Sequence, residues 1–498
     1  MVFIIQGMAF STTVLIAVSL FVVSVWVFKT TARGWRNPLK GVPGPWYTKY
    51  TNLQLKLAVL TGRRIHYVQS LHNRYGSYVR IAPTEVSVAD LEGFKQIHRI
   101  NSGFTKSSWY GDIMRLPRPV MFTMTEANAH AMRRKLFARA FSKTQVREHW
   151  ERLLTSKIHM AIDRIKADAE SGTADLLKWF TLMTSDIATH VFFGESFSMI
   201  ESGQITEYIR ALQNAMVGGG IGFELPLVQA IGKHIPLQAS QEIFASNNYI
   251  LEKSKIAVKN SRRQQSTGGR LPNIFASIIQ EAEKGDIIDD LDVQSEAIGQ
   301  SIAGSDTTAA TLSYLVWAIL SRPTLQAELQ KEVTMLPDGY EDADLENLPL
   351  LNAVINETLR LYGAGLAGLP RMVPSRGAKM GNHFLPEGTT VTTQAYTFHR
   401  DPRYFPDPKK FDESRWLPRY ARSQSEEMKT AYHPFGIGSR ICLGIHMAQM
   451  QLRITTAQFF RECQDARLCP SVTPASMELK DYFVIAPKSH KCEITLRK

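Results

Sequence analysis

Residues 435–444 read Phe-Gly-Ile-Gly-Ser-Arg-Ile-Cys-Leu-Gly, and they are followed by a helix-like run, IHMAQMQLRITTAQFF. Cys442 is therefore expected at a helix N-terminus, where the macrodipole and free N–H groups favour a thiolate over a thiol. Gly436 and Gly438 permit backbone angles that turn amide groups toward the sulfur. Arg440, two residues before the cysteine, is placed to pair with a carboxylate of a bound group.

Taken alone, Cys442 is better explained as a buried structural thiol. The spacing of its neighbours, Phe-x-x-Gly-x-Arg-x-Cys-x-Gly, resembles the haem-binding signature of the cytochrome P450 family, with every defined position present. The resemblance implies that Cys442 is the axial iron ligand of a b-type haem. It also implies that Phe435, Gly436 and Arg440 belong to the loop that holds this cofactor. A thiolate ligand pushes electron density onto iron and favours O–O cleavage.

A second motif, Ala-Gly-Ser-Asp-Thr-Thr at 303–308, lies within a stretch from about 297 to 320 that predicts one long helix. Small residues there leave room over a ligand, and a threonine hydroxyl can bond back to the backbone and bend the helix. Ordinary helix packing explains the same residues equally well. The pattern resembles the oxygen-binding motif of the cytochrome P450 family. That resemblance implies that Asp306 and Thr307 are an acid–alcohol pair that supplies protons.

A third motif pairs Glu357 with Arg360, three residues later on one helix face. Such a pair is usually solvated and structurally unimportant. The resemblance implies instead a structural triad with Arg415, which lies in Glu-Ser-Arg-Trp where the family has Pro-Glu-Arg-Phe. We expect the triad to support the cysteine loop and to take no part in catalysis.

Three further residues are assigned to the haem by the resemblance alone. His130 stands where the family's Trp-x-x-x-Arg helix has tryptophan, and Arg134 follows four residues later. The resemblance implies that Arg134, Arg371 and Arg440 bind the haem propionates, with His130 beside them. The alternative for 130–134 is an ordinary basic helix face.

The first 28 residues predict a transmembrane anchor. Twenty-one uncharged residues run from Met8 to Phe28, and about 20 apolar residues cross a bilayer as a helix. The alternative, a cleavable signal peptide, lacks support because no basic n-region precedes the stretch and no small-x-small site follows it. Four basic residues between 29 and 40 then place the remainder in the cytosol. We expect a single-pass protein of the endoplasmic reticulum membrane with a cytosolic catalytic domain.

Residues 29–45 form a basic, proline-rich hinge, and 46–498 predict one large domain that is mostly α with a small β part. By resemblance this is the cytochrome P450 fold. Several shorter segments are also predicted. They are a helix at 63–75, a hairpin of 78–82 with 85–88, helices over most of 126–360, a loop at 260–273, a strand at 389–393, and a pairing of 482–485 with 492–496. Residues 216–236 fit a mobile lid and an ordinary helix–loop equally well.

The composition excludes several classes of protein. The 498 residues are 44% hydrophobic and 21% charged, which is not the usage of a disordered, collagen-like or polytopic membrane protein. The net charge of +12 comes without zinc-finger or RNA-binding signatures, so nucleic acid is not the expected partner. The resemblance implies an electron donor with an acidic face, and Arg133 and Lys135 are the candidate contacts for it on the basic surface. Four cysteines fit a reducing compartment better than a disulfide framework.

Together with the resemblance, the motifs predict a haem-thiolate monooxygenase that inserts one oxygen atom from O2 into an apolar small molecule. Electrons are expected from NADPH, used indirectly through NADPH–cytochrome P450 reductase. The stretch 360–374 resembles fungal members that act on polyketides or terpenoids. Two alternatives stay open: a desaturase or rearrangement enzyme of the same fold, and a non-catalytic haem-binding membrane sensor.

Overall fold

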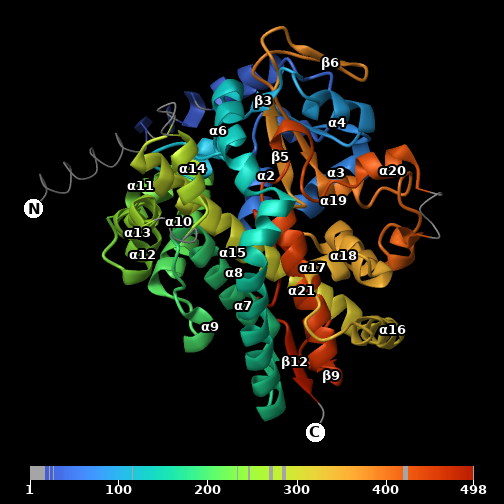
Figure 1. Ribbon diagram of the computed structural model, residues 1–498. Coiled ribbons are helices and arrows are strands. Elements are labelled where there is room, and N and C mark those ends of the chain that lie inside the picture. The colour runs from blue at the N-terminus through green and yellow to red at the C-terminus, as the bar shows by residue number, and fades with distance from the viewer. Residues whose placement is uncertain are drawn as a thin grey trace, which may run out of the picture.

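The computed structural model describes the chain apart from a set of short segments. The residues outside the description are 1–16, 19, 22, 26, 115, 233, 245–246, 268–272, 283–287, 419–423 and 497–498. In the described part, helices form most of the body, and small sheets lie at its top and at its lower end (Figure 1). The predicted class, mostly α with a small β part, is confirmed.

The elements have the following bounds. The α-helices are α2 (Leu53–Leu60), α3 (Arg64–Tyr75), α4 (Leu91–His98), α5 (Trp109–Ile113), α6 (Ala127–Ala140), α7 (Lys143–Ser171), α8 (Leu176–Phe193), α9 (Met199–Ser202), α10 (Glu207–Glu224), α11 (Pro226–Gly232), α12 (Gln238–Phe244), α13 (Asn247–Thr267), α14 (Phe275–Ala282), α15 (Asp290–Leu320), α16 (Pro323–Thr334), α17 (Asp342–Leu345), α18 (Pro349–Tyr362), α19 (Ala395–Phe398), α20 (Glu426–Ala431) and α21 (Ile445–Glu462). The 3-10 helices among the described residues are η1 (Trp46–Lys49), η2 (Glu413–Trp416) and η4 (Gly438–Arg440). The strands are β1 (Tyr78–Ala82), β2 (Glu85–Val88), β3 (Thr105–Lys106), β4 (Ala174–Asp175), β5 (Gly368–Met372), β6 (Ala378–Met380), β7 (His383–Leu385), β8 (Thr390–Gln394), β9 (Ala466–Leu468), β10 (Leu479–Tyr482), β11 (Val484–Pro487) and β12 (Glu493–Leu496).

The centre of the body is α15, whose 31 residues carry apolar side chains around most of its circumference. Such a helix is stable only when it is enclosed, and α15 packs on α8, α13, α18 and α21. Asp289 and Asp292 close its N-terminus with a capping box. A Cβ at Gly304 would lie 3.3 Å from the Cβ of Ala188 in α8. Gly304 therefore allows two helices to pack closely, as the helix-packing explanation of this motif requires.

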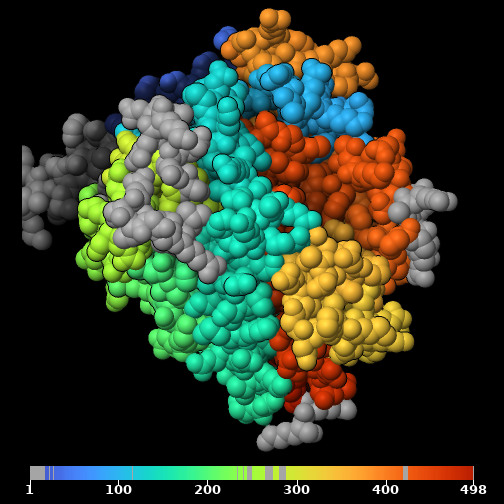
Figure 2. Space-filling view, in the orientation of Figure 1, coloured from blue at the N-terminus to red at the C-terminus, as the bar shows by residue number. Residues whose placement is uncertain are grey.

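The long helix α7 runs down the middle of the face seen in Figure 2, with α9 and α10 on one side and α16 on the other. A buried ion-pair network connects it to α21, the helix that follows Cys442. Asp342 accepts from Arg453 Nε and Nη2 of α21 at 2.7 and 2.8 Å, and from Arg147 Nη2 of α7 at 2.9 Å. This network fixes the position of α21 relative to the rest of the body.

The main sheet has the strand order β1-β2-β8-β5-β3. The predicted hairpin of 78–82 with 85–88 is confirmed, and the predicted strand near 389–393 is β8. In the last antiparallel pair, Lys106 of β3 lies opposite Arg371 of β5. The sheet thus places two cationic side chains next to each other at its edge.

Two sequence predictions are wrong. The C-terminal pairing does not join 482–485 with 492–496, because β10 turns at Phe483 and pairs with β11, while β12 pairs with β4 and β9. The predicted loop at 260–273 is helical as far as Thr267, the last residue of α13. Arginine and glutamine in that polar stretch are good helix formers, which explains the extension.

The proline-rich hinge is clamped to the sheet by Arg80 of β1. This guanidinium is fully buried and donates to the carbonyl oxygens of Leu39 and Val42, both at 2.8 Å, and of Pro45 at 3.3 Å. The backbone N–H of Arg80 also donates to the Pro43 oxygen at 2.7 Å. The proline-rich end of the predicted hinge is therefore bonded to β1.

The predicted anchor at 1–28 lies mostly outside the described residues. Those described between 17 and 35 are helical. Within the part of the chain that the structure describes, no helix is both long enough and apolar enough to cross a bilayer.

Candidate functional site

The loop before α21 has the backbone that its glycines predict. Gly436 and Gly438 have φ of 73° and 69°, in the left-handed region where a side chain is strained. A Cβ at Gly438 would overlap the carbonyl oxygen of His98, so this position also permits a close approach of α4. The N–H of Cys442 donates to the Phe435 oxygen at 2.8 Å and closes the loop.

Cys442 is a free thiol three residues before the first residue of α21. Its side chain is accessible, yet surrounding protein atoms desolvate it, so its accessible surface faces an internal space. Burial raises the pKa of the thiol, against the opposing effects of the Gly444 N–H and of Arg134. The N-terminus of α21 therefore does not lower the pKa of Cys442 below its usual value, as the sequence led us to expect. A coordinated metal ion would instead stabilise the thiolate, since a metal-bound thiol is deprotonated outright.

Cationic side chains from separate elements gather near this loop. Arg134 of α6 donates to the Ile441 oxygen at 2.9 Å, and Arg440 donates to the Met124 oxygen at 2.8 Å. Arg371 of β5 is buried, and its Nε has no hydrogen-bond partner among the described residues. The pKa of Arg440 falls to about 10 because of burial and then of the Arg371 charge. All three predicted arginines are therefore brought together.

Lys106 belongs to the same cluster and was missed by sequence reasoning. Its Nζ donates to the Phe122 oxygen and lies 4.0 Å from the ring centre of Tyr110. Burial, followed by the charges of Arg440 and Arg371, holds its pKa well below the usual value. Its place just before α5 was the only feature from which the sequence could have predicted this role. A single lysine there matches no motif.

His130 lies inside this cluster as a neutral imidazole. Burial first, and then the charges of Arg440, Lys106 and Arg134, lower its pKa to about 3. His130 is buried on the inner face of α6, near Arg134.

The residues present fit a haem. A concentration of buried, mutually repelling cations with an unpartnered Arg371 Nε is costly unless an anion joins it, and a haem carries two propionates. An accessible sulfur within the protein supplies the soft donor that iron takes in thiolate-ligated haem.

The second motif lies on α15. Thr307 Oγ1 donates to the Ala303 oxygen at 2.8 Å, the predicted back-bond, and Ala303 is exposed although its helix crosses the core. Gln213 of α10 donates to Asp306 Oδ1 at 3.3 Å. Burial raises the pKa of Asp306, and this hydrogen bond partly opposes the rise. The carboxyl group therefore keeps its proton to a higher pH than a surface aspartate does.

The predicted triad is buried. Arg360 Nε and Nη2 donate to the two oxygens of Glu357 at 2.8 and 2.7 Å, and Arg415 Nε lies 3.6 Å from Glu357 Oε1. His399 is fully buried and bridges the Arg360 oxygen to the N–H of His433, just before the cysteine loop. The triad is therefore connected through His399 to that loop.

Arg133 is not the surface residue that we expected. It is buried and paired with Asp292 at 2.8 Å and with Glu296 at 3.1 Å. The two residues lie on different faces of α6: Lys135 is exposed to solvent, and Arg133 points toward α15.

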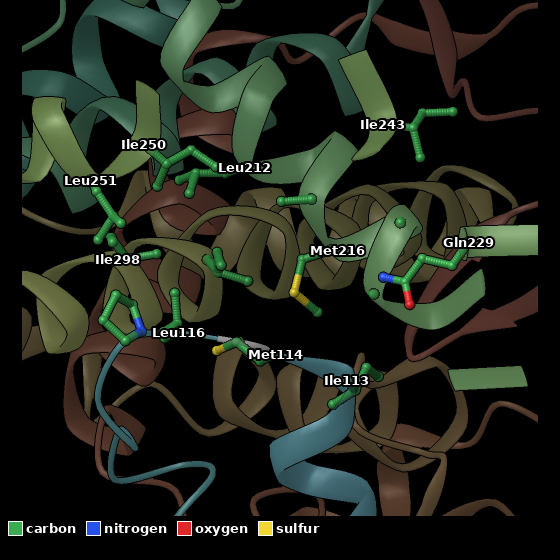
Figure 3. A pocket seen from close by; sticks show the side chains of 15 residues that line it. Ile113, Met114, Leu116, Leu212, Met216, Gln229, Ile243, Ile250, Leu251 and Ile298 are labelled. Carbon is green, nitrogen blue, oxygen red and sulfur yellow. The ribbon is translucent and has the colours of Figure 1, made fainter. Parts of the chain in front are cut away.

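A cavity of about 330 Å³ lies between α10, α13, α15 and the segment that follows α5 (Figure 3). Leu212 and Met216 approach from one side, and Ile113 and Met114 from the opposite side. None of the described lining residues is charged. Gly218 and Gly219, in the segment that fits a mobile lid or a helix–loop, are helical residues of α10 that allow the backbones of α12 and α5 to approach.

Comparisons with known proteins agree with this arrangement. The sequence model of the family described as Cytochrome P450 matches residues 41–494. The chain is 37% identical over 468 residues to the cytochrome P450 monooxygenase cypX of Dothistroma septosporum, with 93% of this chain and 91% of that protein covered. It is 37% identical over 485 residues to the monooxygenase aflV of Aspergillus parasiticus, with 94% of each chain covered. It is 38% identical over 470 residues to the monooxygenase stcB of Emericella nidulans, with 92% and 89% covered.

Proposed function

This chain belongs to the cytochrome P450 family, and from that membership we propose that it is a haem-thiolate monooxygenase that oxidises an apolar small molecule of fungal secondary metabolism. The observation that carries the proposal is the accessible Cys442 thiol in its glycine loop beside a cluster of buried cations. The fungal origin of the relatives supports the metabolic setting, and the uncharged cavity supports an apolar substrate.

Each site residue has a proposed role. Cys442 would hold the iron, and Arg134, Arg371, Arg440 and Lys106 would hold the propionates, with neutral His130 packed among them. When bound, the haem supplies the activation of O2 that no amino-acid side chain provides. The exposed face of α15 at Ala303 and Thr307 would border the reacting centre.

The experiment that tests the function is a turnover assay with substrate candidates and a reductase. We expect substrate-dependent NADPH consumption and a product that has gained one oxygen atom. A product that has only lost two hydrogen atoms would identify a desaturase. Haem-loaded protein that consumes no NADPH with any binding ligand would contradict the proposal and indicate a sensor.

We expect Asp306→Asn to lower turnover about 10²–10⁴-fold, because a positioned acid contributes that much to proton transfer. Since only the protonated carboxyl donates, the rate of the unchanged protein should fall as pH rises through the raised pKa of Asp306. The asparagine variant should lose this alkaline decline. The measurement is the pH–rate profile, together with the share of electrons that ends as hydrogen peroxide.

The matched pair for the alcohol is Thr307→Ala and Ser313→Ala. Both hydroxyls donate to the carbonyl four residues earlier, at 2.8 and 2.9 Å, but Ser313 is fully buried. Thr307→Ala should increase hydrogen peroxide and Ser313→Ala should not. Equal effects would assign Thr307 to helix structure alone.

We further propose an association with the endoplasmic reticulum membrane through one face of the domain as well as through the N-terminal segment. Leu227 and Ile231 of α11 are 78% and 62% exposed, and Leu53 of α2 is 59% exposed. Lys56 of α2 donates to the Glu224 oxygen at the end of α10, so the two apolar surfaces adjoin. Exposed apolar clusters of this kind suit an apolar phase.

A fluorophore whose emission shifts to the blue in an apolar phase tests this face. Attached to the full chain through Ile231→Cys, it should shift when phosphatidylcholine–phosphatidylserine vesicles are added. The matched site is Met335→Cys, since Met335 is 73% exposed at the C-terminal end of α16. The same response at both sites would contradict a specific docking face.

For the electron donor, the exposed Lys135 of α6 stays the candidate contact for an acidic reductase surface. Turnover that does not change with salt concentration would contradict this assignment.

A further inference from the structure

Glu296 of α15 is a buried carboxylate that the proposed chemistry does not use. Only 1% of the residue is exposed. Its Oε1 accepts from the N–H of Met121 at 2.8 Å and from Nη1 of Arg133 at 3.1 Å. A Cβ added at Gly299 would lie 3.2 Å from the Val120 side chain, so the segment that precedes α6 packs closely on α15. A single carboxylate therefore joins α15 both to α6 and to this segment.

The segment forms a compact turn, residues 120–124, which is closed by its own backbone hydrogen bonds. The carboxylate on α15 holds one side of this turn through the peptide N–H described above. On the other side, Arg440 Nη1 donates to the Met124 oxygen at 2.8 Å, and Lys106 Nζ donates to the Phe122 oxygen. The 120–124 turn thus lies between an anionic group on α15 and two of the cations assigned to the propionates.

Arg133 fixes how α6 is rotated about its own axis. The backbone of α6 packs mainly on α14 and α7, and Arg133 connects it to α15 through Asp292 at 2.8 Å as well as through Glu296. The next residue, Arg134, donates to the Ile441 oxygen of the cysteine loop at 2.9 Å. Neighbouring helix residues differ in direction by about 100°. Holding Arg133 against α15 therefore also directs Arg134 toward the cysteine loop.

A buried ion pair of this kind is weak evidence for stability, because apolar residues of similar volume often serve as well. What the Glu296 carboxylate adds is a unique geometry. Its charge and its hydrogen bonds are satisfied only when α6, α15 and the 120–124 turn lie in one arrangement.

We propose that Glu296 is a positioning residue of the haem site, which holds α6 and the 120–124 turn so that Arg134 and Arg440 face the propionates. The inference rests on the roles proposed above for these two arginines. Glu296 acts through Arg133 and through the peptide N–H of the turn, and it touches neither the substrate nor the reacting atoms.

The position depends on the ionised form of the carboxyl group, which compensates the Arg133 charge and makes charge-assisted hydrogen bonds. Burial raises the pKa of Glu296 to about 7, while the charge of Arg133 and the Met121 N–H oppose the rise. Above that pH the carboxylate is ionised and holds both partners. The site should therefore loosen as the pH falls through about 7.

The other charged groups near Glu296 do not change their charge in this range. In the described part of the chain they are Asp292 on the same face of α15, the pair of Arg118 with Asp289 at its N-terminus, and Arg262 of α13, which bonds Asp290 on another face. Aspartate and arginine side chains ordinarily titrate far from neutral pH. His130 of α6 stays neutral, because burial and then the neighbouring cations lower its pKa to about 3.

The test follows the transfer of haem from the loaded protein to excess apomyoglobin by Soret absorbance, between about pH 6 and pH 8.5, a range that brackets the titration of Glu296. We expect the unchanged protein to lose haem about tenfold faster at the acid end, as the loss of one charge-assisted hydrogen bond implies. The midpoint should lie near pH 7. Glu296→Gln should lose haem at the faster rate throughout and show no midpoint.

Asp292→Asn is the matched control. It removes a carboxylate from the same Arg133 but has no bond to the 120–124 turn, so it should keep the midpoint and change the rate less than about threefold. A second variant keeps the test open if the glutamine variant does not fold. Arg133→Met leaves Glu296 without the cation that favours its ionised form, so the midpoint should move to higher pH.

A rate of haem loss that does not vary with pH in the unchanged protein, or a midpoint that survives in Glu296→Gln, would overturn the proposal. Equal effects of Glu296→Gln and Asp292→Asn would overturn it as well, because Glu296 would then be only a counter-charge for Arg133. Haem transfer needs no turnover, so a haem protein that consumes no NADPH but shows this midpoint would retain the inference and reject only the proposed function. Folded protein without a Soret band would reject both.

Discussion

Replacing Cys442 by serine is expected to abolish the strongly red-shifted Soret band of the reduced carbon monoxide complex and to eliminate turnover. A serine hydroxyl is not ionised at neutral pH and does not replace the thiolate as an electron donor to iron. The loop itself should persist, because the Cys442 N–H bond to Phe435 and the left-handed glycines involve only backbone. The measurement is the carbon monoxide difference spectrum, recorded on protein whose circular dichroism is unchanged.

Cys469→Ser is the matched control. Cys469 is also a free thiol, but it is buried between β9 and the C-terminal strands and should have no effect on the spectrum. A histidine-type spectrum from the unchanged protein, or a red-shifted band that survives in Cys442→Ser, would reject Cys442 as the ligand. Either result would remove the principal support for the oxygenase.

The second large effect is expected for Glu357→Gln. Glu357 is fully buried and accepts two bonds from Arg360, one from the Asp412 N–H at 2.8 Å and one from Trp416 Nε1 at 2.9 Å. Glutamine keeps the shape but leaves the Arg360 guanidinium buried without its counter-charge. Breaking such a pair costs about 3–5 kcal/mol of unfolding free energy. Because Arg360 is linked through His399 to the cysteine loop, haem retention should fall as well.

The chain offers a close control on its surface. Glu426 and Lys429 have the same spacing and a 2.7 Å ion pair, but Glu426 is 84% exposed in that pair. Glu426→Gln should change the stability by less than about 1 kcal/mol, as surface pairs do. Chemical denaturation followed by haem absorbance compares the two variants. If the two variants had similar denaturation midpoints, burial of the Glu357–Arg360 pair would add nothing to its stability beyond that of an exposed pair with the same spacing.

Sequence reasoning succeeded where the determining interactions are local. The left-handed glycines of the cysteine loop, the back-bonded Thr307 and the β1–β2 hairpin each depend on residues close in the chain. Helical periodicity likewise found α15 and the helical character of most of the body.

It failed where the partner is remote. Arg133 and Lys135 are neighbours on α6, and only the position of α15 decides that the first is buried and the second exposed. Lys106 joins the cationic cluster because β3 pairs with β5, and His399 bridges helix α18 to the segment before the cysteine loop, which no sequence pattern connects. The C-terminal strands were mispaired because nothing in their sequence marks Phe483 as a turn residue.

The Arg80 clamp has a consequence for how the chain can be shortened. Its guanidinium is satisfied by carbonyl oxygens that belong to the proline-rich segment, so that segment stabilises β1 from outside the sheet. A shortened chain that starts before Leu39 retains those acceptors. A chain that starts at Trp46 leaves the buried Arg80 guanidinium without these acceptors, and the free energy of unfolding should fall by several kcal/mol. The folded domain therefore begins upstream of the prolines.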